Sequence, residues 1–171
     1  MKFTICVSIL MTALTVPVLI AAAAEGLKIT SPVFKDNGTI PKQYTCDGKD
    51  VNPPLVIEGV PSQAKSLALI VDDPDAPVGI WVHWVVWNID PMTKGIKENT
   101  VPKGAAQGMN DFKRVSYGGP CPPSGTHRYF FKLYALDTVL NISSSTTKIQ
   151  LEQAMKGHML EQAQIVGLYK R

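Results

Sequence analysis

Residues 67–91 read LALIVDDPDAPVGIWVHWVVWNIDP, two apolar runs joined by a turn rich in Pro, Asp and Gly. The runs are Leu67 to Val71 and Val82 to Ile89, and each is followed by Asp and Pro. Short apolar runs with many β-branched and aromatic residues, bounded by turn residues, predict β-strands. Both alternating faces of 81–87 are apolar, so we expect this strand to be buried on both sides, as in a sandwich.

Elsewhere the same kind of pattern predicts further strands at 27–30, 55–57, 128–136 and 165–169. A single helix is predicted after Thr147, whose capping-box partner is Gln150. Its stripe at i, i+3, i+4 spacing runs on to Gln162, although Gly157 weakens the helix. His158 lies at the edge of that stripe, which favours a packed or surface histidine over a ligand. Strands dominate, so the sequence predicts a mainly antiparallel β domain.

The length and the charge narrow the possible functions. A chain of 171 residues is long enough for one domain with a substantial core. It carries 17 Lys and Arg against 14 Asp and Glu, without charge runs, so a nucleic-acid partner is not indicated. The Gly- and Pro-rich stretch 101–126 shows little periodicity, and long loops of this kind often carry function.

The N-terminus has the order of a secretory signal peptide. Lys2 precedes an apolar run to Ile20, and four Ala then lead to Glu25. We expect cleavage of residues 1–24, a single domain over 25–171, and a periplasmic or secreted protein; an uncleaved anchor is the alternative. Cys6 leaves with the signal, so Cys46 and Cys121 remain. An even pair in an exported chain indicates a disulfide, with two free thiols as the alternative.

Three of the predicted strands place a polar group on an otherwise apolar face. Asp73 ends the face of Leu67, Leu69 and Val71, while His127 opens the face of Tyr129, Phe131 and Leu133. His83 shares its face with Trp81, Val85 and Trp87. Buried polar groups are costly unless they are paired. The set is therefore either a structural network or a small pocket in which imidazole and phenol groups, with the backbone N–H groups of Gly118 and Gly119, bind an anion.

Two catalytic alternatives use the same residues. Two His and one Asp match a facial-triad metal site, but the ligands lack the close spacing of metal-binding motifs. Ser116 or Ser124 would supply the nucleophile of a Ser–His–Asp hydrolase, but no G-x-S-x-G elbow is present. The spacing of the three Trp within one apolar strand favours a core role over sugar stacking.

Two longer motifs contain these polar residues. The first is DPDAP at 73–77 with Gly79, His83-Trp84 and Asn88. The second is GPCPP at 119–123 with Gly125 and His127-Arg128-Tyr129, followed by LYALD at 133–137. In this order, the two motifs resemble the signatures of the phosphatidylethanolamine-binding protein family. The resemblance spans the mature chain and is closest to the bacterial branch often called Raf kinase inhibitor-like proteins. Exported members of that branch resemble this chain in having a signal peptide and a cysteine pair.

The resemblance implies a two-sheet Greek-key β-sandwich with few peripheral helices and a small anion pocket. Carried over to this sequence, the ligand-binding residues are Asp73, His83, Gly119, Pro122, His127 and Tyr129. Asp75 and Arg128 would support the loop through an ion pair or backbone bonds. The chain departs from the family pattern at Lys113, where a Gly often follows Asn-Asp-Phe, which leaves the shape of that loop open.

The sequence therefore predicts a non-enzymatic, exported binding protein with no cofactor and no metal. Its expected partner is a small anionic ligand or a phospholipid head group, with membrane contact only through the signal peptide or that head group. The alternative is a protein-interaction module that inhibits a protease or kinase through residues 101–126.

Overall fold

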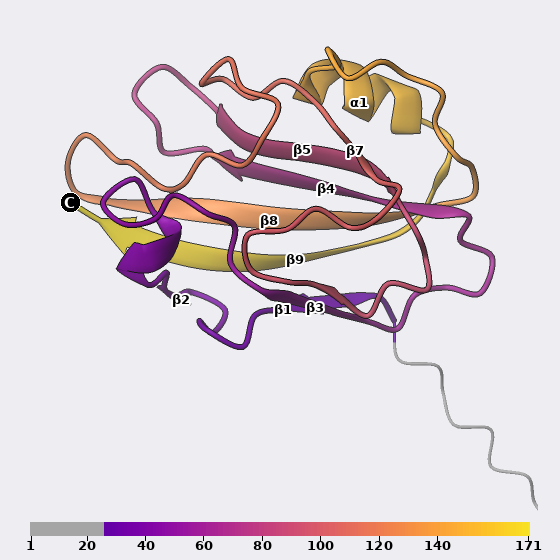
Figure 1. The fold of residues 1–171 in the computed structure, drawn as a ribbon, viewed down its shortest axis with the longest axis horizontal. Coiled ribbons are helices and arrows are strands. Elements are labelled where there is room, and N and C mark those ends of the chain that lie inside the picture. The colour runs from indigo at the N-terminus through magenta and orange to yellow at the C-terminus, as the bar shows by residue number, and fades with distance from the viewer. Residues whose placement is uncertain (1–25) are drawn as a thin grey trace, which may run out of the picture.

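The computed structural model describes residues 26–171. The predicted signal peptide, its cleavage before Glu25 and Cys6 lie outside the described residues. Within 26–171 the chain forms two β-sheets, one α-helix and one 3₁₀ turn, η1 (Lys42–Tyr44) (Figure 1). The predicted mainly β, two-sheet fold with few helices is confirmed.

The large sheet has the strand order β2-β9-β8-β4-β5-β7. Its neighbouring strands are antiparallel, except that β2 runs parallel to β9. The bounds are β2 (Gly38–Thr39), β4 (Ser66–Asp73), β5 (Trp81–Ile89), β7 (Ala106–Gln107), β8 (Thr126–Leu136) and β9 (Met159–Lys170). Because β4 is antiparallel to both β5 and β8, the end of β4 lies beside the beginnings of its two neighbours.

The small sheet has the order β1-β3-β6 and packs on one face of the large sheet (Figure 1). Its strands are β1 (Lys28–Thr30), β3 (Leu55–Glu58) and β6 (Gly95–Ile96). The core between the sheets joins Ile29 and Ile57 of the small sheet to Leu69, Trp84 and Phe131 of the large one, all at most 4% exposed. Burying such side chains stabilises each by about 1.5–3 kcal/mol, which makes this the main layer of the fold.

The opposite face of the large sheet is covered by α1 (Lys148–Met155) (Figure 1). Leu151 and Met155 of the helix pack on the sheet. The fully buried carboxylate of Asp72 also points to this side, where it lies 2.8 Å from Nζ of Lys132 and 3.0 Å from Nζ of Lys148. Consecutive residues of a strand face opposite sides, so Asp73 points into the sandwich side instead.

The predicted helix is correct at its start and wrong at its end. The Thr147 backbone N–H donates to Oε1 of Gln150 at 2.9 Å, as in the predicted capping box. The helix stops at Met155, and Gly157 adopts a positive φ of 82°. His158 lies in the following turn, and residues 159–164, expected to be partly helical, pair with β8 as the first half of β9. Tertiary pairing overrides the helical spacing there.

A bulge in β5 changes the face on which His83 lies. Val71 pairs with Trp84 and Asp72 pairs with Val82, so His83 is an extra residue between the two pairs. Val85 and Trp87 pack on the helix side of the sheet, whereas the His83 ring contacts Tyr129 on the sandwich side. The expectation that His83 shares a face with Val85 and Trp87 is therefore wrong. Bulges re-aim side chains in this way, often beside functional sites.

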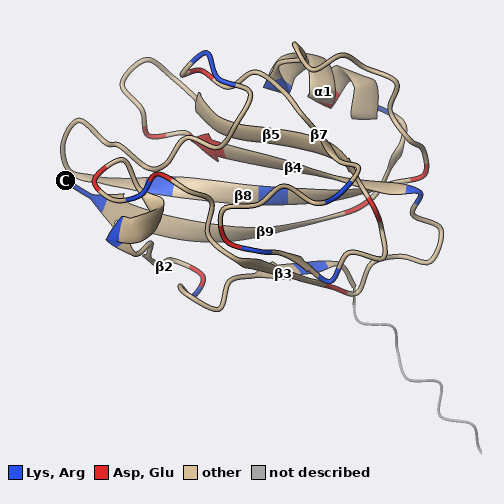
Figure 2. Cartoon of the chain, viewed as in Figure 1, with Lys and Arg blue, Asp and Glu red and all other residues tan. Residues whose placement is uncertain are grey.

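Charges are interspersed along the described chain (Figure 2). Among residues 26–171 no helix is both long enough and apolar enough to cross a membrane.

Candidate functional site

A cavity of about 250 Å³ lies where β4 ends and β5 and β8 begin. It brings together the three polar side chains that the strand faces single out, Asp73, His83 and His127. The rest of its wall is mostly apolar and comes from the 76–81 and 112–123 segments: Ala76, Pro77, Val78, Trp81, Phe112, Cys121, Pro122 and Pro123. Of the predicted ligand-binding residues, Gly119 and Tyr129 do not line this cavity.

His127 and Asp73 form a pair in the wall of the cavity. Nδ1 of His127 donates to Oδ2 of Asp73 at 2.7 Å, and the two side chains are only 10% and 5% exposed. The second oxygen, Oδ1, accepts the backbone N–H of Asp75 at 2.8 Å. Both carboxylate oxygens therefore accept hydrogen bonds from the protein, and the His127 ring is held in one orientation.

Asp75 and Arg128 lie at the outer edge of the site and form a bidentate ion pair. Arg128 donates from Nη2 to Oδ1 at 2.7 Å and from Nε to Oδ2 at 2.9 Å, and its backbone N–H also donates to Oδ2. The side-chain hydrogen bonds from Arg128 lower the pKa of Asp75 to about 2. The pair ties the turn after β4 to the beginning of β8.

His83 is held by the loop that follows β7. Its Nδ1 donates to the Gly118 carbonyl oxygen at 2.6 Å, and its own carbonyl accepts the Gly118 N–H at 3.0 Å. The ring lies edge-to-face with Phe112 and Tyr129, at centroid distances of 5.3 and 5.1 Å. Burial lowers the pKa of His83, which favours the neutral ring.

The Tyr129 hydroxyl is buried behind the cavity. It lies near the Asp73 carboxylate and the Cys121 backbone, but within residues 26–171 neither contact has the geometry of a full hydrogen bond. Burial, and then the negative charge of Asp73, raise the pKa of Tyr129, so the hydroxyl keeps its proton. A buried donor without a hydrogen-bond partner lowers the free energy of unfolding by about 1–3 kcal/mol.

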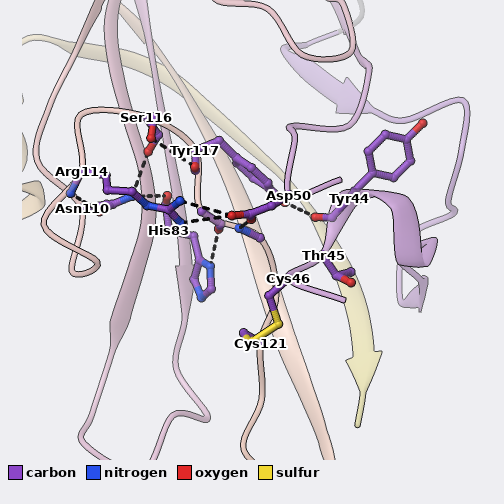
Figure 3. A network of polar contacts seen from close by, with 12 residues as sticks. Tyr44, Thr45, Cys46, Asp50, His83, Asn110, Arg114, Ser116, Tyr117 and Cys121 are labelled. Atoms are coloured by element: carbon purple, nitrogen blue, oxygen red, sulfur yellow. Dashed lines mark hydrogen bonds and ion pairs between the residues drawn. A yellow bond between two sulfur atoms is a disulfide. The ribbon is translucent and has the colours of Figure 1, made fainter. Parts of the chain in front are cut away.

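The two glycines expected to cradle an anion use their N–H groups inside the protein. The Gly118 N–H donates to the His83 carbonyl, and the Gly119 N–H donates to Oδ1 of Asp50 at 2.6 Å. Figure 3 shows this network running from His83 through the glycine loop to Asp50 and Arg114. A Cβ on Gly119 would lie 2.7 Å from the Tyr44 carbonyl oxygen, so this glycine is needed for close packing.

Cys46 and Cys121 form a disulfide, with Cα atoms 5.4 Å apart and a sequence separation of 75 (Figure 3). Cys121 lines the cavity, and Cys46 is exposed. The Cys46 N–H also donates to the Pro120 carbonyl at 3.1 Å. The disulfide thus fixes one wall of the cavity to the segment before β3.

Trp81 and Phe112 line the cavity but were not among the predicted site residues. Trp81 lies two positions before His83 on the same strand, so the alternation of side chains could have predicted that it lies on the same face as His83. Phe112 lies in an irregular loop whose course depends on Asn110, which donates from Nδ2 to the carbonyls of His83 and Ser116. No periodic pattern in the sequence marks such a residue.

The described residues do not have the geometry expected for a Ser–His–Asp hydrolase or for a facial-triad metal site. Ser116 lines a different cavity and bonds the Tyr117 carbonyl, and neither Ser116 nor Ser124 is hydrogen-bonded to His83 or His127 in the described chain. Within residues 26–171 no three His, Cys, Asp or Glu side chains are grouped as metal ligands.

Comparison with solved structures gives the same architecture. A phosphatidylethanolamine-binding protein homologue, CT736 of Chlamydia trachomatis, is 42% identical with a TM-score of 0.83, covering 85% of this chain and 98% of that one. Escherichia coli YbcL, described as a member of the mammalian family, is 31% identical with a TM-score of 0.81, covering 86% and 99%.

Sequence relatives agree with the structural comparison. The UPF0098 protein of Methanothermobacter thermautotrophicus is 51% identical over 150 residues, covering 85% of this chain and 99% of the relative. That of Aquifex aeolicus is 48% identical over 160 residues, covering 90% and 94%. The family model described as phosphatidylethanolamine-binding protein matches residues 30–170. This chain therefore belongs to the phosphatidylethanolamine-binding protein family.

Proposed function

We propose that the chain is an exported, non-enzymatic binding protein whose cavity accepts a small anion such as phosphate, a carboxylate or a phosphorylated head group. The observation that carries this proposal is the meeting of Asp73, His83 and His127 in one cavity with apolar walls. Pockets of this kind, apolar with a few convergent polar groups, are the usual form of small-ligand sites.

The polar groups supply suitable contacts. Each histidine uses Nδ1 for an internal bond, so Nε2 is the ring atom that remains for a ligand. A proton on Nε2 turns the ring into a charged donor, and hydrogen bonds between charged groups are about twice as strong as neutral ones. Tyr129 does not line the cavity, so its hydroxyl is not among these contacts.

The cavity is small enough to select a head group rather than a whole lipid. About 250 Å³ is at or below the lower end of the usual range for ligand pockets. Val78 and Ile80 beside it are 78% and 54% exposed. An apolar remainder of a ligand would therefore lie outside the cavity, against this turn.

Export is part of the proposal and rests on residues 1–24 and on the cysteine pair. Disulfides persist in oxidising compartments, which suits a periplasmic or secreted protein. Expression of the full chain in a bacterial host, followed by intact mass measurement of the exported form, tests this. The expected mature protein begins at Glu25 and lacks both free thiols; a full-length protein in the cytoplasm would contradict export.

The alternative, an inhibitor acting through residues 101–126, has less support. Asn110 and residues 117–120 are buried and bonded to β5 and to the segment before β3. An inhibitory loop needs an exposed backbone for its target, and that part of the segment offers little.

Histidine NMR provides the direct test of the anion site. The chain has three His, and His158 is a built-in control because it pairs with Asp137 on the surface at 47% exposure. Titration with inorganic phosphate or phosphoethanolamine is expected to shift the ring signals of His83 and His127 and leave those of His158 in place. If neither cavity histidine responds, the anion site is wrong.

A further inference from the structure

The hydrogen bond of His83 fixes which ring nitrogen carries the proton. Its Nδ1 lies 2.6 Å from the Gly118 carbonyl oxygen. A carbonyl oxygen only accepts, so Nδ1 must be the N–H. A neutral imidazole has a single N–H, and Nε2 of neutral His83 is therefore a lone-pair acceptor.

His127 also carries its proton on Nδ1, for a different reason. Its Nδ1 donates to Asp73, whose other oxygen already accepts the Asp75 N–H. Both Asp73 oxygens thus receive hydrogen atoms from the protein, as an ionised carboxylate requires. Nε2 of a neutral His127, a residue that lines the cavity, is then a second lone-pair acceptor.

No Lys or Arg lines the cavity among the described residues. The three nearby guanidinium groups each have an acidic partner: Arg128 with Asp75, Arg114 with Asp50, and Arg171 with Asp47. The N–H groups of Gly118 and Gly119 are also occupied. With both rings neutral, the cavity therefore holds one negative charge and two acceptors, and it repels a fully ionised anion.

Charged and titratable groups surround both rings. His83 faces the Asp73 carboxylate from β4 and the Tyr129 phenol from β8, with Asp72 further away across the sheet. Burial is the largest influence and lowers the pKa of His83, so the ring is neutral near pH 7 in the free protein. His127 faces Asp73 and Asp75, and Tyr169 is its partner position on β9.

We propose that the cavity takes its anion together with one proton, and so selects anions of weak acids, such as phosphate monoesters, over anions of strong acids, such as sulfate esters. This deepens the proposed anion-binding function and rests on it. The proton is shared along the contact between a ligand oxygen and Nε2 of a histidine: a ligand P–OH donates to the lone pair, or the protonated ring donates to the ligand oxygen. In both cases one proton lies between the same two atoms, the ligand oxygen and Nε2. A sulfate ester brings no proton, so it depends on protonation of a ring beside its neighbouring carboxylate.

Methyl phosphate and methyl sulfate form a matched pair of probes, because the methyl phosphate monoanion has the charge and nearly the shape of methyl sulfate and differs by one hydroxyl. The second pKa of a phosphate monoester is about 6. Calorimetry at pH 6.0 is expected to give methyl phosphate at least tenfold tighter binding than methyl sulfate. Above pH 7 its association constant is expected to fall about tenfold per pH unit, and buffers of different ionisation enthalpy should report uptake of one proton when the dianion binds.

Equal affinity for the two esters at pH 6.0, or a flat affinity for methyl phosphate from pH 6 to 8, would overturn the proposal while leaving an anion site in place. Absence of binding by either ester and by inorganic phosphate would instead overturn the anion site itself.

The Asp73→Asn variant gives a second measurement. It removes the negative charge that repels the anion, and it is expected to reduce the preference for methyl phosphate over methyl sulfate at least threefold. Asp137→Asn, at the surface pair with His158, is the control and should leave the preference unchanged.

Discussion

His127 and Asp73 form a nearly buried hydrogen-bonded pair, with Nδ1 of the ring 2.7 Å from Oδ2 of the carboxylate. His158 and Asp137 form the same pair at 2.8 Å, but with both side chains 47% exposed. The chain thus contains one pairing in two environments. The buried copy lines the cavity described above, whereas the exposed copy lies on the surface.

Replacing His127 by Ala is expected to weaken phosphate binding about 10- to 100-fold, since one charge-assisted hydrogen bond contributes about 1.5–3 kcal/mol. The change also leaves Asp73 without its buried partner, so the free energy of unfolding should fall by about 1–3 kcal/mol. Calorimetry and urea unfolding measure the two effects. His158→Ala is the matched control and should change neither by more than a few tenths of a kcal/mol; equal effects of the two variants would remove the special role of His127.

The stability of the free protein is expected to decrease as the pH falls below about 6.5 because of His83. Its pKa is lowered in the folded state, so below the unfolded-state value of about 6.5 the unfolded chain binds more protons. The free energy of unfolding then falls with decreasing pH, by at most about 1.4 kcal/mol per unit for one group. Above that pH the contribution of the group is constant.

His83→Asn isolates this effect, because the amide N–H of Asn can replace the Nδ1–H bond to Gly118 but does not titrate. The difference in unfolding free energy between the wild type and His83→Asn should change with pH between 6.5 and 4.5. The same difference for His158→Asn gives the dependence of a surface histidine. A constant difference for His83→Asn would show that the buried ring does not remain neutral.

The alternation of side chains along strands predicted that Asp73 and His127 would lie close together, for a specific reason. Asp73 and His127 end apolar faces on β4 and β8, which are neighbours, so one strand end brings them together. The same rule placed His83 on the wrong face, since the bulge that re-aims it depends on how β5 pairs with β4. The sequence of β5 itself contains no Gly or Pro that would reveal a bulge.

Other errors arose where distant pairing decides the local structure. The helical spacing after Met155 continues in the sequence, but residues 159–164 pair with β8 and become strand. The loop glycines offered N–H groups in principle, yet Asp50, a residue far away in the sequence, takes the one on Gly119. Turns such as this are fixed by tertiary contacts, which single-sequence patterns do not contain.

Lys113 adopts a φ of 61°, in the left-handed region that favours glycine, at the position where relatives were expected to carry Gly. A side chain there costs about 1–2 kcal/mol, part of which Gly loses again through its larger unfolded-state entropy. Lys113→Gly is therefore expected to raise the free energy of unfolding by about 0.5–1 kcal/mol. Lys113→Ala retains the Cβ and should give no such gain in the same denaturant titration. A loss of stability with Gly would contradict this explanation.

The disulfide is expected to stabilise the fold more than it shapes the cavity. Cross-linking positions 75 residues apart contributes about 4 kcal/mol in the chain-entropy model. The two segments are also joined by three hydrogen bonds: Cys46 N–H to the Pro120 carbonyl, Gly119 N–H to Asp50, and the Tyr117 hydroxyl to the Tyr44 carbonyl. Because these hydrogen bonds do not depend on the disulfide, the cavity wall should keep its place when the disulfide is removed, while the unfolded chain gains conformational freedom.

The double variant Cys46→Ala with Cys121→Ala should therefore unfold at a clearly lower temperature yet bind phosphate within about threefold of the wild type at 25 °C. A folded variant whose phosphate affinity falls more than tenfold would instead assign the disulfide a direct part in holding the cavity open.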